Sequence, residues 1–152
     1  MTFSKGCSFA HVIPEKIKKW LTEEELSFIQ PIGEPAQSTL FNYLVSLPSD
    51  TKVNLVQSSH RKDSICVSSV ISFSDDQTKK LRKKQNSEKT KIFSKIRFKL
   101  APVDVALDIK DNKIIASHII YYDGLTKDRL FKTITDLEKA CTLMNLAVQK
   151  AL

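Results

Sequence analysis

Glycine is scarce in this sequence, and its scarcity limits the chemistry that the chain can carry. Only three glycines occur, at positions 6, 33 and 124. Neither of the common glycine-rich loops that cradle a phosphate can be built from glycines so far apart. Nucleotide-dependent catalysis is therefore disfavoured.

Cysteines and long apolar runs are also few. The three cysteines, Cys7, Cys66 and Cys141, are widely spaced and form no C-x-x-C pair, so neither a disulfide framework nor a zinc knuckle is suggested and a reducing compartment is indicated. No stretch approaches the roughly 18 apolar residues of a membrane span, and the N-terminus lacks the layout of a secretory signal. We expect a cytoplasmic protein without membrane contact.

Positive charge is present in excess, but it is concentrated in one segment. The chain has a formal net charge of +7. Between Lys79 and Lys99 there are ten basic residues and a single acid, Glu88, which gives this segment +9 and leaves the rest of the chain at −2. The basicity is therefore a local property that can serve as a binding patch.

Length and apolar content predict one folded domain. The chain of 152 residues has the usual size of a single domain, and a hydrophobic content of 41% supplies a core. Residues 1–12 show no periodicity and are interpreted as a flexible N-terminal arm, which leaves 13–152 as a single α+β domain. An amphipathic helix is expected from Pro14 to Glu25, with the proline at its start.

The next segments have the alternation of β-strands. Thr22 and Glu25 could form a capping box for a further helical turn, but the prolines that follow preclude a long helix. We expect a brief strand at 26–29 and a loop, then paired strands at 40–47 and 52–57. The run 65–73 is rich in β-branched residues and almost uncharged, which predicts a central strand.

The basic segment 75–100 is interpreted as helical. Asp75 and Asp76 suit a helix N-terminus, and a helical apolar stripe is present only late in the segment. A strand at Ile96 to Leu100 is the competing interpretation, because apolar and basic residues alternate there.

A hairpin and a long helix complete the expected order. Strands at 103–110 and 113–122 with a turn at Asp111-Asn112 would place Ile109 opposite Ile114 and put His118 on the apolar face. From Thr126 to Leu152 apolar residues recur at spacings of three and four, so this helix could line the core or a subunit seam.

Residues that could carry metal or catalytic chemistry are isolated. Cys7 and His11 are four apart, but no second pair completes a metal site, and Cys66 lies in an apolar strand where a free cysteine usually fills the core. Asp104 and Asp108 share one strand face, which invites an acid–base hypothesis, although a solvated outer face explains them more simply. We predict that the protein is not an enzyme, that it binds no cofactor and no metal, and that it has no catalytic residue.

Two groups of residues remain as candidate binding sites. The first is a basic cluster that could contact phosphates or an acidic partner, although residues 78–90 contain no aromatic side chain on which a base could stack. Its members are Lys79, Lys80, Arg82, Lys83 and Lys84. The second is a recognition surface at a strand end, formed by Tyr121, Tyr122 and Asp123, which could equally be core and turn.

The order of elements, α-β-β-β(-β)-α-β-β-α with an antiparallel sheet packed against helices, resembles the type III secretion chaperone-like fold. The pair Trp20-Leu21, the string from Ile120 to Phe131 and the closing helix resemble an archaeal family named domain of unknown function 2299, over about 14–150. That family supplies no activity to carry over. The fold implies small dimers that hold unfolded client segments on apolar patches without a cofactor. Such chaperones tend to be acidic, whereas this chain is basic.

These observations predict a non-enzymatic, homodimeric protein-interaction or chaperone-like module. The alternative is a nucleic-acid-associated protein that uses the basic segment 79–99. Steep salt dependence of binding would indicate the second, and an exposed apolar groove would indicate the first.

Overall fold

A computed structural model describes residues 2–30, 39–58, 60–110 and 112–152, with side chains described except in 2–11, 39 and 40. The turn residue Asp111 and the loop expected after residue 30 therefore lie largely outside the described residues. In chain order the elements are α1 (Thr2–Glu23), β1 (Ser27–Ile29), β2 (Thr39–Ser46), β3 (Lys52–Ser58), β4 (Ser64–Ser72), α2 (Asp75–Arg82), α3 (Asn86–Leu100), β5 (Ala106–Ile109), β6 (Lys113–Tyr121), a short 3-10 turn (Tyr122–Gly124) and α4 (Lys127–Ala151).

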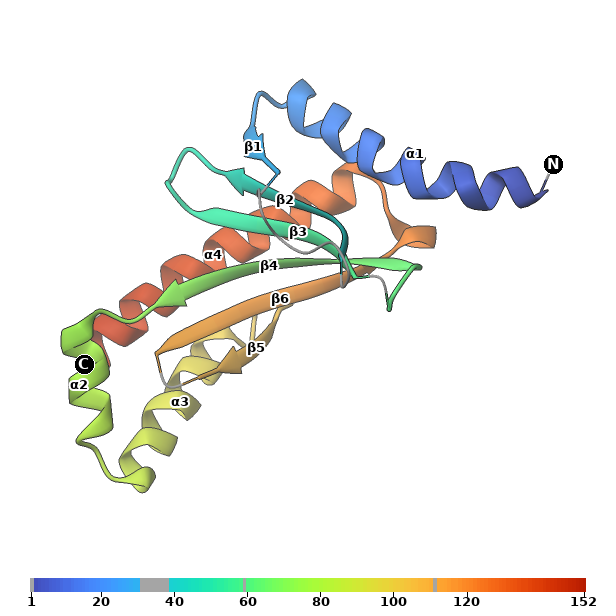
Figure 1. Ribbon diagram of the computed structural model, residues 1–152. Helices are drawn as coiled ribbons and strands as arrows, with labels where there is room; N and C mark the ends of the chain where they lie inside the picture. The colour runs from blue at the N-terminus through green and yellow to red at the C-terminus, as the bar shows by residue number, and fades with distance from the viewer. Residues whose placement is uncertain (1, 31–38, 59, 111) are drawn as a thin grey trace.

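The strands form one antiparallel sheet in the order β1-β2-β3-β4-β6-β5 (Figure 1). The expected α+β class is confirmed and each expected strand is present, although the strand expected at 103–110 is shorter, since β5 covers only Ala106–Ile109. β4 lies inside the sheet as predicted, paired with β3 on one side and along its whole length with β6 on the other. The hairpin register is also confirmed, because Ile109 pairs with Ile114.

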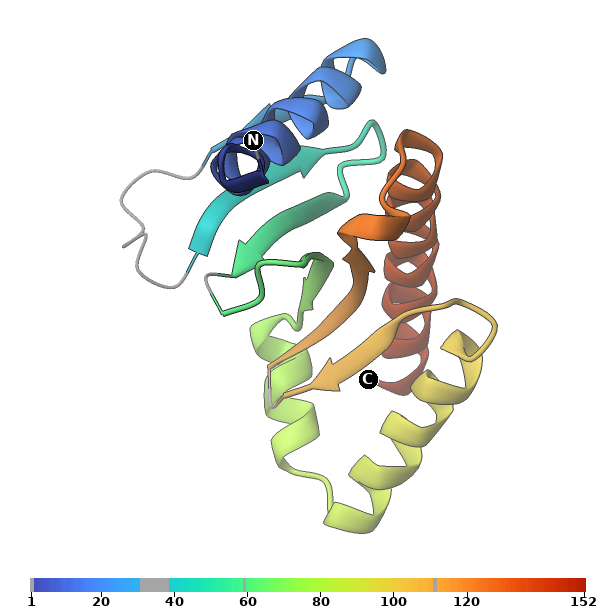
Figure 2. The same ribbon diagram turned by 90° about the vertical axis from the view of Figure 1, so that its right-hand side faces the viewer.

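The helices α3 and α4 lie on the same side of the sheet, and the apolar core lies between the helices and the strands (Figures 1 and 2). Strand residues alternate, so one set of side chains faces this core. Leu55, Val67 and Ile114 belong to that set and have no exposed surface. α1 meets the same set at the other end of the sheet, where Lys18 Nζ lies 5.7 Å from the centre of the Tyr43 ring.

The expected start of the first helix at Pro14 is wrong, because α1 begins at Thr2 and Pro14 lies inside it. The backbone is thus helical through most of the segment 1–12 that we interpreted as an arm. The end of the helix agrees with the expectation. Leu26 N–H donates to Leu21 O and Glu25 N–H donates to Thr22 O, both at 3.0 Å, and Glu25 takes a left-handed conformation with φ 57°. This is the hydrogen-bond pattern of a Schellman cap.

The basic segment is helical as predicted, but it forms two helices. Ser74 caps α2: its Oγ accepts from Gln77 N–H at 3.1 Å, and Gln77 Oε1 accepts from Ser74 N–H at 3.0 Å. The chain turns at residues 83–85, where Gln85 is extended. α2 buries only Leu81, so little packing holds it in line with α3. The strand interpretation of Ile96 to Leu100 is wrong, because these residues belong to the helix α3, on which Ile96 and Leu100 are both buried.

The last helix packs on the sheet of its own chain. Thr126 Oγ1 accepts from Arg129 N–H at 3.1 Å and caps α4. The apolar stripe predicted for this helix, which includes Leu130, Leu137 and Met144, is buried. It therefore lines the core. No described helix is both long and apolar enough to cross a membrane.

Candidate functional site

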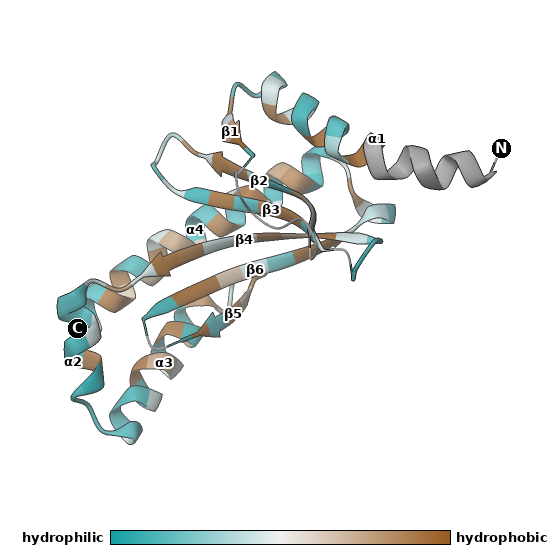
Figure 3. Ribbon diagram, viewed as in Figure 1, coloured by the Kyte–Doolittle hydropathy of each residue, from teal (hydrophilic) through white to brown (hydrophobic). Residues whose placement is uncertain are grey.

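The basic cluster is divided between two helices and an intervening turn. Lys79 and Arg82 lie on α2 and are exposed, and Lys83 is exposed at its C-terminus. Lys80 Nζ donates to the backbone oxygen of Leu152 at 3.0 Å, which ties α2 to the end of α4. Of the five predicted residues, Lys84 lines a cavity between α3 and α4. The rest of the basic segment continues along α3, and hydrophilic residues dominate the α2–α3 turn in Figure 3.

A groove between α3 and α4, here called the lysine groove, gathers more of the basic residues. Its volume is about 500 Å³. The side of the groove carried by α3 and the preceding turn combines four lysines with two isoleucines and one acid. The described residues that line it are Lys84, Glu88, Lys91, Ile92, Lys95, Ile96, Lys99, Ala147, Lys150 and Ala151.

The charges of the lysine groove are poorly compensated from within. Glu88 is its one acid, and Glu88 Oε2 lies 4.0 Å from Lys84 Nζ, at the limit of an ion pair. Exposed pairs of this kind contribute little. The groove therefore has four further lysines around an apolar floor in which Ile96 is 1% exposed and Ala147 is 7% exposed.

Sequence reasoning missed the contribution of α4 to this groove. Ala147, Lys150 and Ala151 lie at the three- and four-residue spacing that places side chains on one helix face. That spacing is visible in the sequence, and the small alanines are the signal that another helix can approach closely. Nothing in the sequence shows which helix does so.

The predicted recognition surface lies at the end of β6 and is divided between two roles. A cavity of about 550 Å³ is lined, among the described residues, by Asp63, Tyr121, Tyr122 and Asp123. Tyr121 is 49% exposed. Tyr122 instead serves the fold: its hydroxyl donates to Gln57 Oε1, and its N–H donates to Asp63 O at 2.8 Å. Burial, with a smaller contribution from Asp63, raises the pKa of Tyr122.

The sheet has a second face, opposite α3 and α4, that no described helix covers (Figures 1 and 2). Its middle is uncharged, with the pair Ser68 and Ser117 between apolar side chains. Val70 is 44% exposed and Ile119 is 39% exposed. We call this surface the open sheet face and define it by Val56, Cys66, Ser68, Val70, Ile115, Ser117, Ile119 and Tyr121, which neighbour one another across β3, β4 and β6.

The two aspartates that suggested acid–base chemistry do not converge. Asp104 Oδ2 lies 3.9 Å from His118 Nδ1, whereas Asp108 Oδ2 lies 3.8 Å from Lys110 Nζ. His118 is on the buried face of β6, as predicted, since the buried residues Ala116 and Ile120 flank it on that face.

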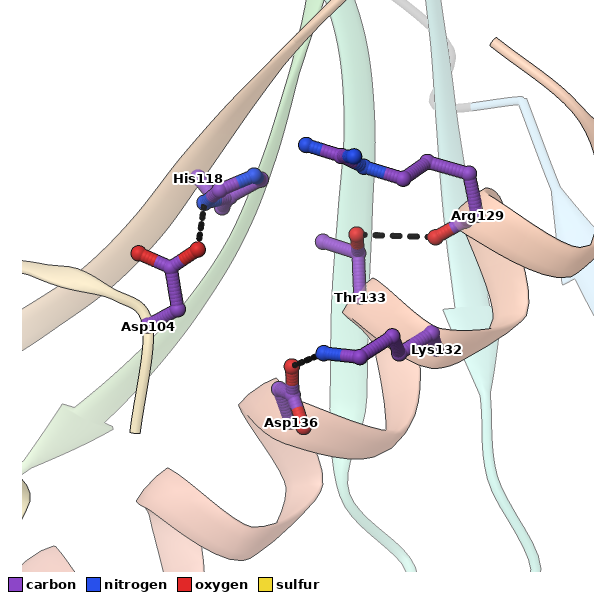
Figure 4. Close-up of polar contacts among 6 residues, drawn as sticks. All are labelled: Asp104, His118, Arg129, Lys132, Thr133 and Asp136. Atoms are coloured by element: carbon purple, nitrogen blue, oxygen red, sulfur yellow. Dashed lines mark hydrogen bonds and ion pairs between the residues drawn. The ribbon is translucent and has the colours of Figure 1, made fainter. Parts of the chain in front are cut away.

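A small polar pocket surrounds His118 (Figure 4). Its volume is about 110 Å³, and α4 supplies Arg129, Lys132, Thr133 and Asp136. Lys132 Nζ lies 3.0 Å from Asp136 Oδ2, and Thr133 Oγ1 donates to Arg129 O at 2.9 Å. Within this small space Lys132 and His118 each lie beside a carboxylate, and the Thr133 hydroxyl is engaged by a backbone oxygen.

Cys66 and Cys141, the cysteines whose side chains are described, are free thiols that do not build a reactive site. Cys66 and His118 lie on opposite faces, because Val67 and not Cys66 pairs with His118. Burial raises the pKa of the thiols of Cys66 and Cys141, which lowers their reactivity. Among the described residues no group of three acidic, histidine or cysteine side chains is placed to hold a metal ion. The side chains of Cys7 and His11 lie outside those residues.

Comparisons with known proteins bear on the whole domain and not on one site. No curated protein matches the chain. The crystal structure of an uncharacterised protein from Methanothermobacter thermautotrophicus matches 90% of this chain and 96% of its own, with a TM-score of 0.73 and 28% sequence identity. A family model described as an uncharacterised conserved protein, DUF2299, matches residues 13–148. The chain therefore belongs to the DUF2299 family.

Proposed function

We propose that this chain is a non-enzymatic protein-interaction module, chaperone-like in that it binds polypeptide without a cofactor, and that it pairs with a second copy of itself through the open sheet face. The observation that carries this proposal is the uncovered apolar surface on β4 and β6. Val70 and Ile119 are exposed there, and Tyr121 is 49% exposed at the strand end. Contiguous apolar patches of this kind mark interaction sites on soluble proteins.

A second copy is a partner that the uncharged open sheet face can accommodate. Each copy carries +7, so two copies repel each other over most of their surfaces. The side chains that define the open sheet face are uncharged, and its serines, Ser68 and Ser117, pair across β4 and β6 at its centre. Two sheets that pack face to face bury such side chains between them at a spacing of about 10 Å.

Sedimentation velocity across a concentration series tests this proposal. The chain should sediment as a dimer, and Val70→Lys should weaken the dimer by about tenfold or more, because burying an unpaired charge is costly. The matched control is Leu146→Lys, which adds the same charge at a side chain that is 50% exposed on α4. A monomer at all concentrations, or equal weakening by both variants, would contradict the proposal.

Nucleic-acid association is the alternative function, and the exposed lysines of α2 favour it. Lys79, Arg82 and Lys83 are exposed, and they belong to the segment 79–99, which has ten basic residues against one acid. Contacts to phosphates would make the affinity fall steeply with salt. Anisotropy titrations with short RNA and DNA across a salt series, with the five predicted basic residues replaced together, distinguish this alternative from a solvated basic surface.

A further inference from the structure

We propose that the lysine groove between α3 and α4 binds an acidic, amphipathic segment of a partner protein. The groove joins two chemical features that one ligand must satisfy together: an apolar floor and a basic rim. Ile92, Ile96, Ala147 and Ala151 supply the floor, and Lys91, Lys95, Lys99 and Lys150 supply the rim.

The charge of the groove selects an acidic ligand. Five lysines line it and Glu88 is its one acid, so an approaching carboxylate gains attraction that the groove does not supply to itself. The lysines are spaced along α3 at four-residue intervals from Lys91 to Lys99. They therefore follow one side of the helix over about two turns, which matches carboxylates spaced along a peptide.

The floor of the groove distinguishes a protein segment from nucleic acid. A phosphate backbone offers no apolar group to Ile92 or Ala151. Among the described residues, no aromatic side chain lines the groove to stack on a base, and no arginine lines it to bind a phosphate with two hydrogen bonds. A peptide helix with apolar residues on one face and acids beside them fills such a groove in a known mode of recognition.

The site is distinct from the surface of self-association. The lysine groove lies on the helix side of the sheet, and the open sheet face lies on the other side (Figure 2). This inference deepens the proposed protein-binding role by naming a partner class, but the two surfaces can fail separately. A Val70→Lys variant that loses the dimer should still bind the acidic segment, so each proposal has its own readout.

The test is a fluorescence-anisotropy titration of the full chain, at near-physiological salt, against three labelled probes. The first is a synthetic glutamate-rich peptide with leucines at i, i+3 and i+4 spacing. The second is the same peptide with serine in place of leucine, which keeps the charge and removes the apolar face. The third is a single-stranded oligonucleotide of equal charge.

The expected result is that the leucine peptide binds more tightly than the other two probes. The double variant Lys91→Gln with Lys95→Gln should lower the affinity for the leucine peptide about tenfold, because two modest charge contacts are lost. The matched control, Lys79→Gln with Lys83→Gln, removes the same charge outside the groove and should change the affinity less than about twofold. Ala151→Gln adds bulk to the floor of the groove without touching the core, so it should also lower the affinity for the leucine peptide.

Four results would overturn the proposal. In the first, the serine peptide or the oligonucleotide binds as tightly as the leucine peptide. In the second, the two double variants weaken binding of the leucine peptide equally. Either result would indicate general attraction of polyanions. The leucine peptide could fail to bind. Finally, phosphatidylserine vesicles could bind more tightly than the peptide and lose binding with Phe98→Ser, which would assign α3 to a membrane surface, since Phe98 is 82% exposed.

Discussion

The Sγ of Cys141 on α4 lies 3.0 Å from the Oγ of Ser69 on β4, and Ser69 Oγ donates in turn to the backbone oxygen of Lys52 at 2.7 Å. This short chain of hydrogen bonds crosses the interface between the helix and the sheet. Ser69 is 1% exposed and Cys141 is 5% exposed. Each buried polar group therefore has a partner in the middle of an otherwise apolar contact.

Replacing Ser69 should destabilise the domain through this chain. Ser69→Ala leaves the backbone oxygen of Lys52 and the thiol of Cys141 without their partner, and the free energy of unfolding should fall by about 1–3 kcal/mol. Urea unfolding measures the change. Ser68→Ala, one residue away on the open sheet face, is the control and should change the stability by less than about 0.5 kcal/mol. Equal losses would show that the buried contact contributes nothing specific.

Replacing Tyr122 should change both stability and its dependence on pH. Tyr122→Phe removes the donor to Gln57 Oε1, and because Gln57 is 5% exposed the loss should be about 1–3 kcal/mol. Since the pKa of Tyr122 is raised in the folded state, the unfolded chain loses its proton first, from about pH 10 upward. The stability of the original chain should then fall as the pH rises above that value, and part of this fall should vanish in the variant.

The control for that experiment is Tyr121→Phe, which changes the exposed neighbour and should leave the neutral-pH stability nearly unchanged. Chemical denaturation at several pH values between neutrality and pH 11 measures all three proteins. An identical alkaline slope in the original chain and in Tyr122→Phe would contradict the prediction, because it would show that Tyr122 ionises at the same pH in the folded and unfolded states.

Glu25 occupies a backbone conformation that glycine adopts more easily. Its φ of 57° is in the left-handed region, at the position where helices commonly end in glycine. Glu25→Gly should therefore raise the stability by about 0.5–1 kcal/mol, despite the greater entropy of the unfolded chain. Thermal unfolding checks the result. Glu24→Gly, at a position without a positive φ, is the matched control and should destabilise the protein.

Truncating a side chain should lower the stability greatly on one face of α3 and hardly at all on the other. Ile96 is 1% exposed, so Ile96→Ala should cost about 2–5 kcal/mol by leaving a cavity. Phe98, two residues later, is 82% exposed, and Phe98→Ser should stay within about 0.5 kcal/mol of the original chain. Urea unfolding of both variants measures the contrast. A large loss for Phe98→Ser would mean that this side chain is covered in solution.

Most of the fold could be predicted because its elements have clear periodicity. Alternation up to Ile109 predicts the hairpin, although β5 begins only at Ala106. The register follows from a two-residue turn, because a slip by one residue would turn every apolar side chain outward. The long stripe of α4 was visible for the same reason. Pattern reasoning works where one face of an element is consistently apolar.

The errors arose where local sequence and structure disagree. Pro14 is a favourable first residue of a helix, so its position inside α1 could not be inferred from its chemistry. The break between α2 and α3 has no proline or glycine to mark it. The residue that caps the start of α2 is Ser74, which precedes Asp75 and Asp76, the residues whose charge suits a helix start. These boundaries depend on which side chains find packing partners.

The candidate site was only half visible for a different reason. Lys91, Lys95 and Lys99 belong to the basic segment and could be recognised as a patch. The groove itself needs Lys150 and Ala151, which are more than fifty residues away in the chain and meet α3 only after folding. A contact between two separately predicted helices is a property of the tertiary packing, and composition does not contain it.

The amide of Phe73 donates to the carbonyl of Asn112 at 2.9 Å. This hydrogen bond closes the base of the segment between the two residues, here called the excursion, which carries α2, α3 and β5. Directly beside the hydrogen bond, β4 and β6 pair with each other. Within the excursion, β5 is held by its pairing with β6 and α3 by its buried Ile96 and Leu100, whereas α2 buries only Leu81. Insertions or changes of charge in α2 and the turn after it therefore need not propagate into the strands.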